Sequence, residues 1–352
     1  MSATSVPSSR NANAARRPGG TDVARLAGVS QKTVSRVFNG EPTVSEETRE
    51  RVLAAAARLG YRPNGAARAL LTGRTYRIGV VSLGTAHFGP SSLLIALERA
   101  TRSTGYSLSI AHTFEDDPDG LRSAADRLLA QGVDAIILSE PIDDGGEPLE
   151  ADVPVLTLGT APAVRAPTVL SVPAAEGGDA AAAATRYLLG LGHQTVHHIA
   201  GPQRWWAARA RLQNWRNALE AAGAPVPEPL EGDWSPASGY EIGRRLAHDV
   251  DVTAIFAAND EMAIGAIHAL HEAGKDVPGD VSVAGFDDIP AAAHVLPPLT
   301  TVSSDNTDLA DIGLRYLVGY LTDPGSPPEE PPPHAHRLVI RQSTASPRTR
   351  QP

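Results

Sequence analysis

The sequence predicts a small all-α domain of helix-turn-helix type followed by a larger α/β core. Two short helical segments flank a glycine turn in residues 22–38, and a third follows. Beyond residue 75, short apolar runs alternate with longer helical segments, which is typical of parallel sheets covered by helices. Residues 1–77 hold 13 Lys and Arg against 5 Asp and Glu, although the whole chain has a formal net charge of −9. A basic N-terminal fifth on an acidic body favours a polyanion-binding domain, with a solvated charged surface as the alternative.

The bulk composition limits the classes of protein that fit. A length of 352 residues with 42% hydrophobic content suits two or three domains. The absence of cysteine excludes disulfides and agrees with a reducing compartment. No apolar run reaches the ~18 residues of a membrane span, and the first twenty residues lack the apolar segment of a signal peptide. We therefore expect a disordered tail over residues 1–18 and a cytoplasmic protein with no membrane partner.

The first helical segment is expected over Asp22–Ala27. Val23, Leu26 and Ala27 are expected on its buried face. Gly28 is expected to end the helix, because glycine adopts the left-handed conformation of a tight turn without strain.

The second helical segment is expected to start after Ser30, whose hydroxyl can accept a free backbone N–H. Val34 and Val37 would face inward, and the polar side chains would face outward: Gln31, Lys32, Ser35 and Arg36. A third helix, "VSEETRERVLAAAARLGY", is expected to be capped by Ser45. Helix, glycine turn and helix form the helix-turn-helix pattern, which places its second helix in the major groove of DNA. The alternative is a three-helix bundle with exposed charges.

The outward side chains of this second helix suit base recognition. Gln31 can pair with adenine, and Lys32 or Arg36 can pair with guanine. The pattern therefore predicts a sequence-specific DNA-binding domain.

Two stretches carry a specific resemblance to a known family. "DVARLAGVSQKTVSRVFNG" and "VSEETRERVLAAAARLGYRPNGAARAL" resemble the DNA-binding headpiece of the lactose-repressor (LacI) family of bacterial transcription regulators, and the resemblance continues to about residue 345. It implies a headpiece over residues 19–62 and a hinge helix over residues 63–75 that orders on the operator. A leucine of each hinge helix enters the minor groove in that family, a position that Leu70 matches, with Ala67 on the same face. The sequence departs from the family at Gly19-Gly20-Thr21, so we expect a less firmly started first helix.

The expected DNA interface combines the outward face of the second helix with the matched hinge positions. Its residues are Ser30, Gln31, Lys32, Thr33, Ser35, Arg36, Asn39, Ala67 and Leu70. The expected partner is double-stranded operator DNA.

The alternating segments beyond residue 75 are expected as strands and helices of parallel sheets. The expected strands are Ile78–Ser82, Leu108–Ala111, Ala135–Leu138, Val155–Leu158, Val169–Val172, Val196–Ala200, Ala254–Ala257 and Val281–Phe286. The expected helices are Ser91–Ser103, Leu121–Ala130, Gly177–Leu191, Arg209–Ala222, Ala237–His248 and Glu261–Ala273.

The resemblance implies that these segments form a periplasmic-binding-protein-like core of two doubly wound lobes. The implied division, by residue, is 76–173 and 305–331 for the first lobe, 174–304 and 332–345 for the second, and 346–352 for a tail. Three crossovers would fall near Pro173, near Asp305 and in the proline-rich stretch Pro324–Pro333, which suits an extended connector.

A ligand site is expected at the carboxyl ends of the parallel strands, where such sheets bind ligands. Asn259 and Asp287 follow two of the strands, while "ARARLQNW" and "EGDWS" add Arg211 and Trp234. An arginine, an amide, a carboxylate and an aromatic face suit the hydroxyls and the apolar side of a sugar. The resemblance implies that these four residues contact the effector. Core packing or helix capping is the alternative for each, and capping is the expected role of the neighbouring Asp260 and Asp288.

The expected site departs from the lactose repressor, which gives the family its name, on the side of the first lobe. Gly159 replaces a ligand-binding aspartate, Ser139 replaces an asparagine, and Asn306 replaces a phenylalanine. These changes leave a sugar as the expected effector, with a galactoside as the first candidate, but they put the identity of the sugar in doubt.

Several other patterns do not indicate a site. Histidines cluster at His193, His197 and His198 and alternate at His334 and His336, yet cysteine and carboxylate partners at metal-ligand spacing are absent. No nucleophile elbow, Walker loop or dinucleotide fingerprint is present, so we expect no metal, no cofactor and no enzyme activity. The pair Trp205-Trp206 looks exposed, and the sequence does not decide its role.

The function predicted from the sequence is a transcription repressor controlled by a small sugar between the lobes. Two protomers would bind a pseudo-palindromic operator as a homodimer. Two alternatives remain open: a purine or other co-repressor that strengthens DNA binding, and a sugar-binding protein that does not bind DNA.

Overall fold

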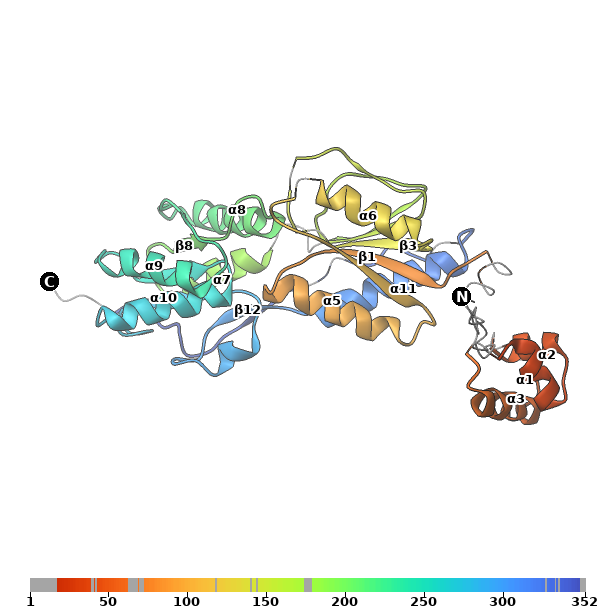
Figure 1. Ribbon diagram of the computed structural model, residues 1–352. Helices are drawn as coiled ribbons and strands as arrows, with labels where there is room; N and C mark the ends of the chain where they lie inside the picture. The colour runs from red at the N-terminus through yellow and green to blue at the C-terminus, as the bar shows by residue number, and fades with distance from the viewer. Residues whose placement is uncertain are drawn as a thin grey trace, which may run out of the picture. The chain divides into compact units, whose positions relative to one another are not determined.

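The computed structural model describes residues 18–348, apart from residues 39–40, 42, 63–68, 70–72, 118, 140, 144, 174–178, 327, 333 and 335. Three of the expected DNA-contacting residues, Asn39, Ala67 and Leu70, lie outside the described residues. By its internal contacts the chain divides into two compact units, Met1–Thr75 and Tyr76–Pro352 (Figure 1). The units are called the headpiece and the core below.

The headpiece contains three helices, α1 (Gly20–Ala27), α2 (Gln31–Phe38) and α3 (Glu46–Leu59). Gly28 ends α1 with φ +67°, and the Ser30 hydroxyl accepts the backbone N–H of Thr33 at 3.1 Å. Ser45 caps α3 by accepting the N–H of Thr48 at 3.4 Å. The expected glycine turn and both serine caps are therefore confirmed.

The start of α1 compensates for its glycines. The helix begins earlier than expected, and the Gly19 N–H donates to the Asp22 carboxylate at 2.9 Å. A carboxylate at this position also complements the positive end of the helix dipole. The departure at Gly19-Gly20-Thr21 therefore leaves a helix that starts with a side-chain cap.

The headpiece core is built from small apolar side chains. Val23, Ala24, Val34 and Val37 are buried against α3. Leu26 is 43% exposed, so its expected place on the buried face of α1 was wrong. Residues 23, 24 and 27 lie on one side of an α-helix, and position 26 falls outside that stripe.

The first lobe of the core is a five-stranded parallel sheet in the order β2-β1-β3-β5-β7. Its strands are β1 (Arg77–Leu83), β2 (Ser107–Thr113), β3 (Ala135–Ser139), β5 (Val155–Leu158) and β7 (Val169–Val172). Its helices are α5 (Phe88–Thr101), α6 (Gly120–Ala130) and α11 (Asn306–Thr322). Figure 1 shows α6 on one face of this sheet and α5 with α11 on the other. Alternate residues explain this layering, since Val80 packs toward α5 and Val81 toward α6.

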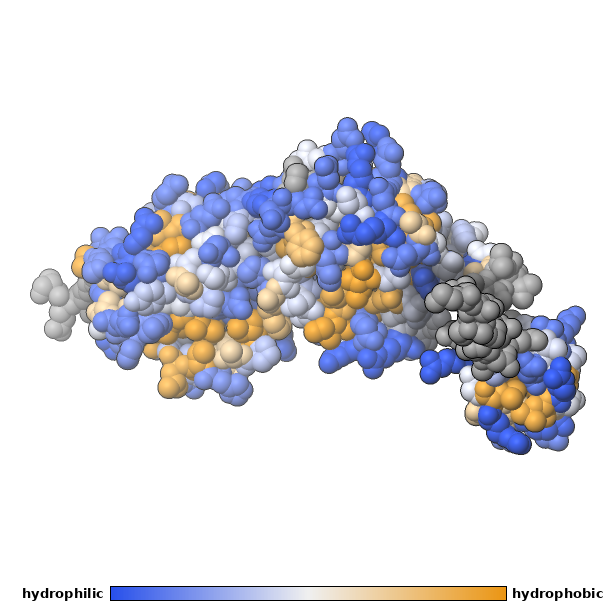
Figure 2. Space-filling view, in the orientation of Figure 1, coloured by the Kyte–Doolittle hydropathy of each residue, from blue (hydrophilic) through white to orange (hydrophobic). Residues whose placement is uncertain are grey.

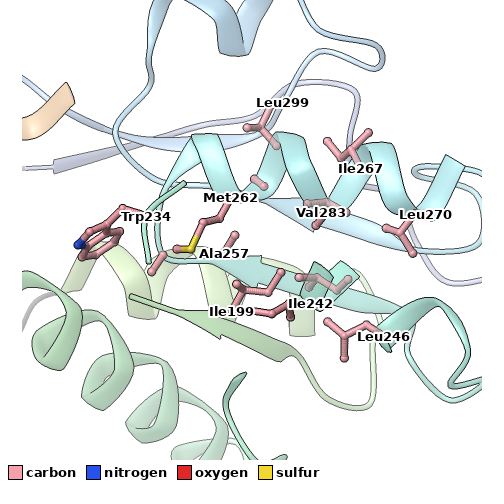
Figure 3. Close-up of a cluster of buried hydrophobic side chains, with 14 of the residues drawn as sticks. Ile199, Trp234, Ile242, Leu246, Ala257, Met262, Ile267, Leu270, Val283 and Leu299 are labelled. Carbon is pink, nitrogen blue, oxygen red and sulfur yellow. The ribbon is translucent and has the colours of Figure 1, made fainter. Parts of the chain in front are cut away.

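The second lobe is a four-stranded parallel sheet in the order β11-β10-β8-β9. Its strands are β8 (His197–Ala200), β9 (Leu230–Glu231), β10 (Ala254–Ala257) and β11 (Ser282–Ala284). Its helices are α7 (Asp179–Gly190), α8 (Trp206–Ala221), α9 (Pro236–Ala247) and α10 (Asp260–Glu272). Figure 3 shows Ile199, Ala257 and Val283 of the sheet packed against the side chains of α9 and α10.

Four further strands and a 3-10 turn lie outside these two sheets in the part of the core that the structure describes. The strands are β4 (Leu149–Glu150), β6 (Val164–Arg165), β12 (Thr301–Ser304) and β13 (His336–Val339), and the turn is η2 (Pro290–Ala293). β12 and β13 pair antiparallel, with Thr301 opposite Val339. α11 packs on α5 of the first lobe, while β12 and β13 pack on α7 of the second, and the three crossovers stay a prediction. The lobe boundaries in residues stay a prediction.

All eight strands expected from the apolar runs are present, and each agrees with the structure to within two residues at either end. None of the helices described is long and apolar enough to cross a membrane.

Candidate functional site

A cavity of about 290 Å³ lies between the two lobes of the core, at the carboxyl ends of their strands. Its volume is at the lower end for small-molecule sites. All four residues expected to bind an effector, Arg211, Trp234, Asn259 and Asp287, line it. The structure therefore brings together side chains that come from four separate parts of the sequence.

The charged part of the cavity wall is an ion pair. Arg211, on the second turn of α8, donates to the Asp287 carboxylate at 3.1 Å, and the two side chains are only 17% and 14% exposed. Burial raises the pKa of Asp287, and the positive charge of Arg211 opposes that rise. The guanidinium also donates to the carbonyl of Ala258 and lies 3.7 Å from the ring centroid of Phe286. A buried pair that lines a cavity offers donors and an acceptor at fixed positions to a ligand with hydroxyl groups.

Asn259 has a structural role that the sequence analysis named as the alternative. Its side-chain oxygen accepts the N–H of Met262 at 2.9 Å and so caps α10. Its amide donates to the carbonyl of Trp234 at 2.9 Å. The side chain still lines the cavity, so Asn259 holds Trp234 in place while presenting one edge to the site.

Trp234 is held tightly against the second lobe. Its ring occupies the space above Gly201, where a Cβ would lie 2.2 Å from the ring, so only glycine permits this packing. Figure 3 shows the indole nitrogen on the side turned away from Met262 and Ala257. The backbone of Trp234 has φ +72°, and that of Asp287 has φ +106°. Such left-handed conformations are costly for non-glycine residues and concentrate at functional sites.

Trp205 and Trp206 are part of the same cavity wall, so their expected exposure was wrong for Trp205, which is buried. The Trp205 ring packs edge to face on Trp234, with centroids 5.5 Å apart, and on His87 at 5.6 Å. Trp206 begins α8 and carries the guanidinium of Arg209 over its ring at 4.4 Å. The sequence pattern had no signal for this role, because the contacts join segments that are distant in the chain.

The side of the cavity that belongs to the first lobe is less polar. Ser139, Gly159 and Asn306 line it, as expected from the departures noted above. Asn306 donates to the Ser92 hydroxyl at 2.6 Å, which occupies one of its amide hydrogens. Phe88, Pro90 and Leu93 of α5 provide an apolar surface beside these residues.

Asp260 and Asp288 do not cap helices, so that expectation was wrong. Asp260 accepts the N–H of Ile289 at 2.8 Å and the hydroxyl of Thr301, and it ties the loop after β11 to β12. Asp288 pairs with Arg341 at 2.6 Å. The backbone turns at both residues, with φ +106° at Asp287 and +54° at Asp288, and the two carboxylates have different partners.

His193 has hydrogen-bond partners within the second lobe, whereas Nδ1 of His336 is buried with none among the described residues. His193 hydrogen-bonds Thr253 and Ser282 at 3.0 and 3.1 Å, and burial lowers its pKa. His336 lines the cavity, and burial, with the charge of Arg211 adding to it, lowers its pKa to about 4. Within the described residues, no group of three His, Cys, Asp or Glu is placed to hold a metal ion.

On the headpiece, α2 presents polar side chains at its N-terminal end. Gln31 and Lys32 are exposed, and Thr33, Ser35 and Arg36 are partly exposed. Arg36 pairs with Glu41 at 3.3 Å, with side chains 44% and 43% exposed. The buried face of α2 carries Val34 and Val37, so the polar face is turned outward as expected.

Two family models match separate parts of the chain. A model of the "lacI family" of bacterial regulatory proteins matches residues 21–64, and a model of the periplasmic binding protein-like domain matches residues 185–344. The chain is 34% identical over 310 residues to the ribose operon repressor of Escherichia coli K12, covering 86% of this chain and 93% of the relative. It is 35% identical over 289 residues to the lactose operon repressor of the same strain, covering 81% and 79%.

Solved structures extend this similarity to the fold. A Lac repressor dimer bound to operator and the anti-inducer ONPF superposes with a TM-score of 0.77 at 30% identity, covering 94% of this chain and 100% of the other. A complex of the transcriptional regulator CelR with cellobiose superposes with a TM-score of 0.66 at 32% identity, covering 93% and 100%. The chain belongs to the LacI family of bacterial regulatory proteins.

Proposed function

We propose that this protein is a transcription repressor whose affinity for operator DNA is set by a small sugar bound in the cavity between the lobes. The buried Arg211–Asp287 pair in the cavity wall carries the proposal. A desolvated arginine and carboxylate bind vicinal hydroxyls well, because each hydroxyl both donates and accepts. Trp234 and Trp205 add aromatic faces for the apolar side of a sugar ring.

The DNA-binding part of the proposal rests on the outward face of α2. Gln31, Lys32 and Arg36 are the side chains proposed to read base edges, and Ser30, Thr33, Ser35 and Asn39 are proposed to support them. Ala67 and Leu70 are proposed to enter the minor groove. The basic charge of the N-terminal residues favours association with the phosphate backbone.

Ligand binding would change the angle between the lobes and separate the two hinge segments of a dimer, which lowers operator affinity. The relatives named above, a ribose operon repressor, a lactose operon repressor and a regulator in complex with cellobiose, support a sugar as the effector class. A galactoside remains the first candidate. The protein would act by binding rather than by catalysis, in the cytoplasm where the operator is accessible.

A purine co-repressor is the second candidate. The chain is 32% identical over 334 residues to a repressor named PurR of Haemophilus influenzae. The cavity also has several flat aromatic side chains, which stack on a planar base as readily as on a sugar.

A thermal-shift screen of the purified protein against pentoses, galactosides, other pyranosides and purines distinguishes these candidates. A ligand that binds only the folded state raises the melting temperature. We expect a rise with a sugar, and loss of that rise in Asp287→Asn. A rise with purines alone would replace the sugar with a purine effector and leave the DNA-binding proposal standing.

A further inference from the structure

A short antiparallel pairing joins the two lobes at one edge of the cavity. Residues 141–143 follow β3 of the first lobe, and residues 204–206 lead into α8 of the second. Ile142 and Trp205 form an isolated antiparallel bridge. The Asp143 N–H donates to the carbonyl of Arg204 at 2.8 Å, and the Trp206 N–H donates to the carbonyl of Pro141 at 3.0 Å. We call these two paired segments the strap.

Side chains strengthen the strap from both lobes. Arg209 of α8 donates to the Asp143 carboxylate at 2.6 Å, with the two side chains 38% and 30% exposed. The Arg204 guanidinium donates to the carbonyl of Glu115, which follows β2, at 2.9 Å. The strap therefore connects the ends of two strands of the first lobe to the start of one helix of the second.

Apolar packing makes the strap part of the second lobe's core. Ile142 is 3% exposed and belongs to the same buried cluster as Trp205 and Trp234, and Leu83 at the end of β1 joins it. The Ile142 side chain, which belongs to the first lobe, is thus buried among side chains of the second lobe. This contact lies apart from the segments where the chain itself is expected to pass between the lobes.

The strap also forms part of the cavity wall. Pro141, Trp205 and Trp206 all line the cavity. Separating the lobes at this edge would break both backbone hydrogen bonds, pull Ile142 out of its cluster and leave the Asp143 charge without its partner.

We propose that the strap holds the cavity closed in the ligand-free protein and is the gate that must release for a ligand to enter. The Asp143–Arg209 ion pair stabilises the closed strap, and the strap in turn holds the Trp205 side chain in the cavity wall, so Trp205 is a positioning residue. This inference rests on the proposed function only in taking the cavity as the effector site.

Amide hydrogen exchange tests the closed state directly, because Asp143 and Trp206 donate the two backbone bonds of the strap. We expect slow exchange at both amides in the wild-type protein. Asp143→Asn keeps the size of the side chain but removes the charge, so it should speed exchange at Trp206 by ~2–5-fold, as suits a half-exposed ion pair. Arg209→Gln should speed exchange at Trp206 at least as much, because it also removes the contact of the guanidinium with the Trp206 ring. The double variant should exchange no faster than Arg209→Gln, since both substitutions break the same ion pair.

Glu147→Gln is the matched control. It removes the ion pair between Arg122 and Glu147 within the first lobe, in which Arg122 Nη2 lies 2.7 Å from Glu147 Oε2. Exchange at Trp206 should stay at the wild-type rate in this variant. Two results would show that the strap does not hold the cavity closed. One is exchange at Asp143 and Trp206 as fast as in an unstructured peptide, and the other is an equal effect of Glu147→Gln and Asp143→Asn on exchange at Trp206.

A reversible covalent lock tests the gate. The chain has no cysteine, so Ile142→Cys with Trp205→Cys places the only two thiols opposite each other across the bridge. Such a pair has Cα atoms roughly 4.5 Å apart, within the range that a disulfide spans. The probe is acrylamide, which quenches the fluorescence of the cavity residues Trp206 and Trp234 on collision.

Oxidation should lower the acrylamide quenching constant of this variant, and a reductant should restore it, because only the open strap admits the probe. Equal quenching in the oxidised and reduced forms would rule out the gate. Neither measurement uses a sugar or DNA. A ligand screen in which no compound raises the melting temperature would therefore contradict the proposed function but not the role of the strap as a gate. Equal quenching in the two redox forms would contradict the gate but not the proposed function.

Discussion

Asp287 and Asp288 are neighbours in the segment that follows β11, yet they have different partners. Asp287 faces the cavity and pairs with Arg211, whereas Asp288 pairs with Arg341. The variants Asp287→Asn and Asp288→Asn each remove one carboxylate charge that pairs with an arginine. Only Asp287 lines the cavity, so comparing the two variants separates an effect on ligand binding from an effect on stability.

We expect Asp287→Asn to weaken effector binding by ~10-fold or more, since it removes a charge-assisted hydrogen bond worth roughly 1.5–3 kcal/mol. Asp288→Asn should lower the melting temperature but leave effector affinity within about twofold. Isothermal titration with the sugar found in the thermal-shift screen measures both. Equal loss of affinity in the two variants would remove Asp287 from the binding site.

Asp260 makes the stability of the core depend on pH. Burial raises its pKa to about 8, against the hydrogen bond from Thr301. The folded state then holds a proton that the unfolded state has lost, so Asp260 contributes stability below about pH 4 that falls away as the pH rises toward 8. We expect the unfolding free energy to decline over this range by up to ~1.4 kcal/mol per pH unit from this group.

Asp260→Asn keeps the side chain neutral at every pH and should flatten that part of the profile. Urea denaturation at pH 5, 6, 7 and 8 compares the two proteins. If the unfolding free energy of the wild-type protein changed with pH in parallel with that of Asp260→Asn, Asp260 would be ionised in the folded state over this range.

At the scale of single elements, α2 is the segment with the most specific proposed task. Its caps and apolar face fix it on the headpiece, and its polar N-terminal end is left for DNA. The pair Arg36–Glu41 lies at the other end of that polar face. Glu41 holds Arg36 in this pair, and we propose that it competes with DNA for the guanidinium.

Arg36→Ala should cost about 1–3 kcal/mol of specific operator binding and leave effector binding unchanged. Glu41→Gln frees the guanidinium and removes a charge that repels phosphate, so it should strengthen DNA binding most at low salt. Fluorescence anisotropy with labelled operator at two salt concentrations checks both variants. Unchanged operator affinity in Arg36→Ala would take Arg36 out of the recognition set.

The elements were the most predictable part of this fold. Regular apolar runs and cap residues are local signals, so β5, β7 and β10 begin and end where the runs Val155–Leu158, Val169–Val172 and Ala254–Ala257 do. The two-residue strands β4, β6 and β9 carry no such pattern. Ala24 and Leu26 of α1 show the limit of helical periodicity, because residues 23, 24 and 27 and residues 23, 26 and 27 both form a plausible apolar stripe, and only packing against α3 selects the first.

The cavity position was predictable for Asn259 and Asp287, which follow strands, and for Arg211 and Trp234, which match the family pattern. It was not predictable where packing between the lobes supplies the residue. Arg211, Trp234, Asn259 and Asp287 all reach the cavity. Trp205 and Ile142 could not be paired from the sequence, since 63 residues separate them and neither segment has a strand pattern. The bond from the Asn259 amide to the Trp234 carbonyl likewise joins segments that are distant in the sequence.

For the whole molecule, the core leaves apolar surface uncovered on one face. Figure 2 shows apolar patches over α5 and beside the segment that follows α10, and exposed apolar side chains in these two parts of the chain include Ile95 and Leu296, which is 88% exposed. A two-fold dimer that pairs this face with itself would cover both patches and place two headpieces on one operator.

We expect a dimer by gel filtration with light scattering, and a shift toward monomer with weaker operator binding in Leu296→Asp. Val250→Asp is the matched control, because Val250 is 60% exposed on the segment that follows α9 and should leave the dimer intact. A stable tetramer, or a monomeric wild-type protein at micromolar concentration, would contradict the dimer.

Occupancy of the cavity is proposed to set the affinity for DNA. The most direct test titrates the sugar from the thermal-shift screen into protein bound to labelled operator, and in a separate experiment measures sugar affinity with and without operator. We predict that the sugar weakens operator binding, that operator weakens sugar binding by the same factor, and that Asp287→Asn abolishes the response. Operator affinity that stays constant at saturating sugar would contradict the account.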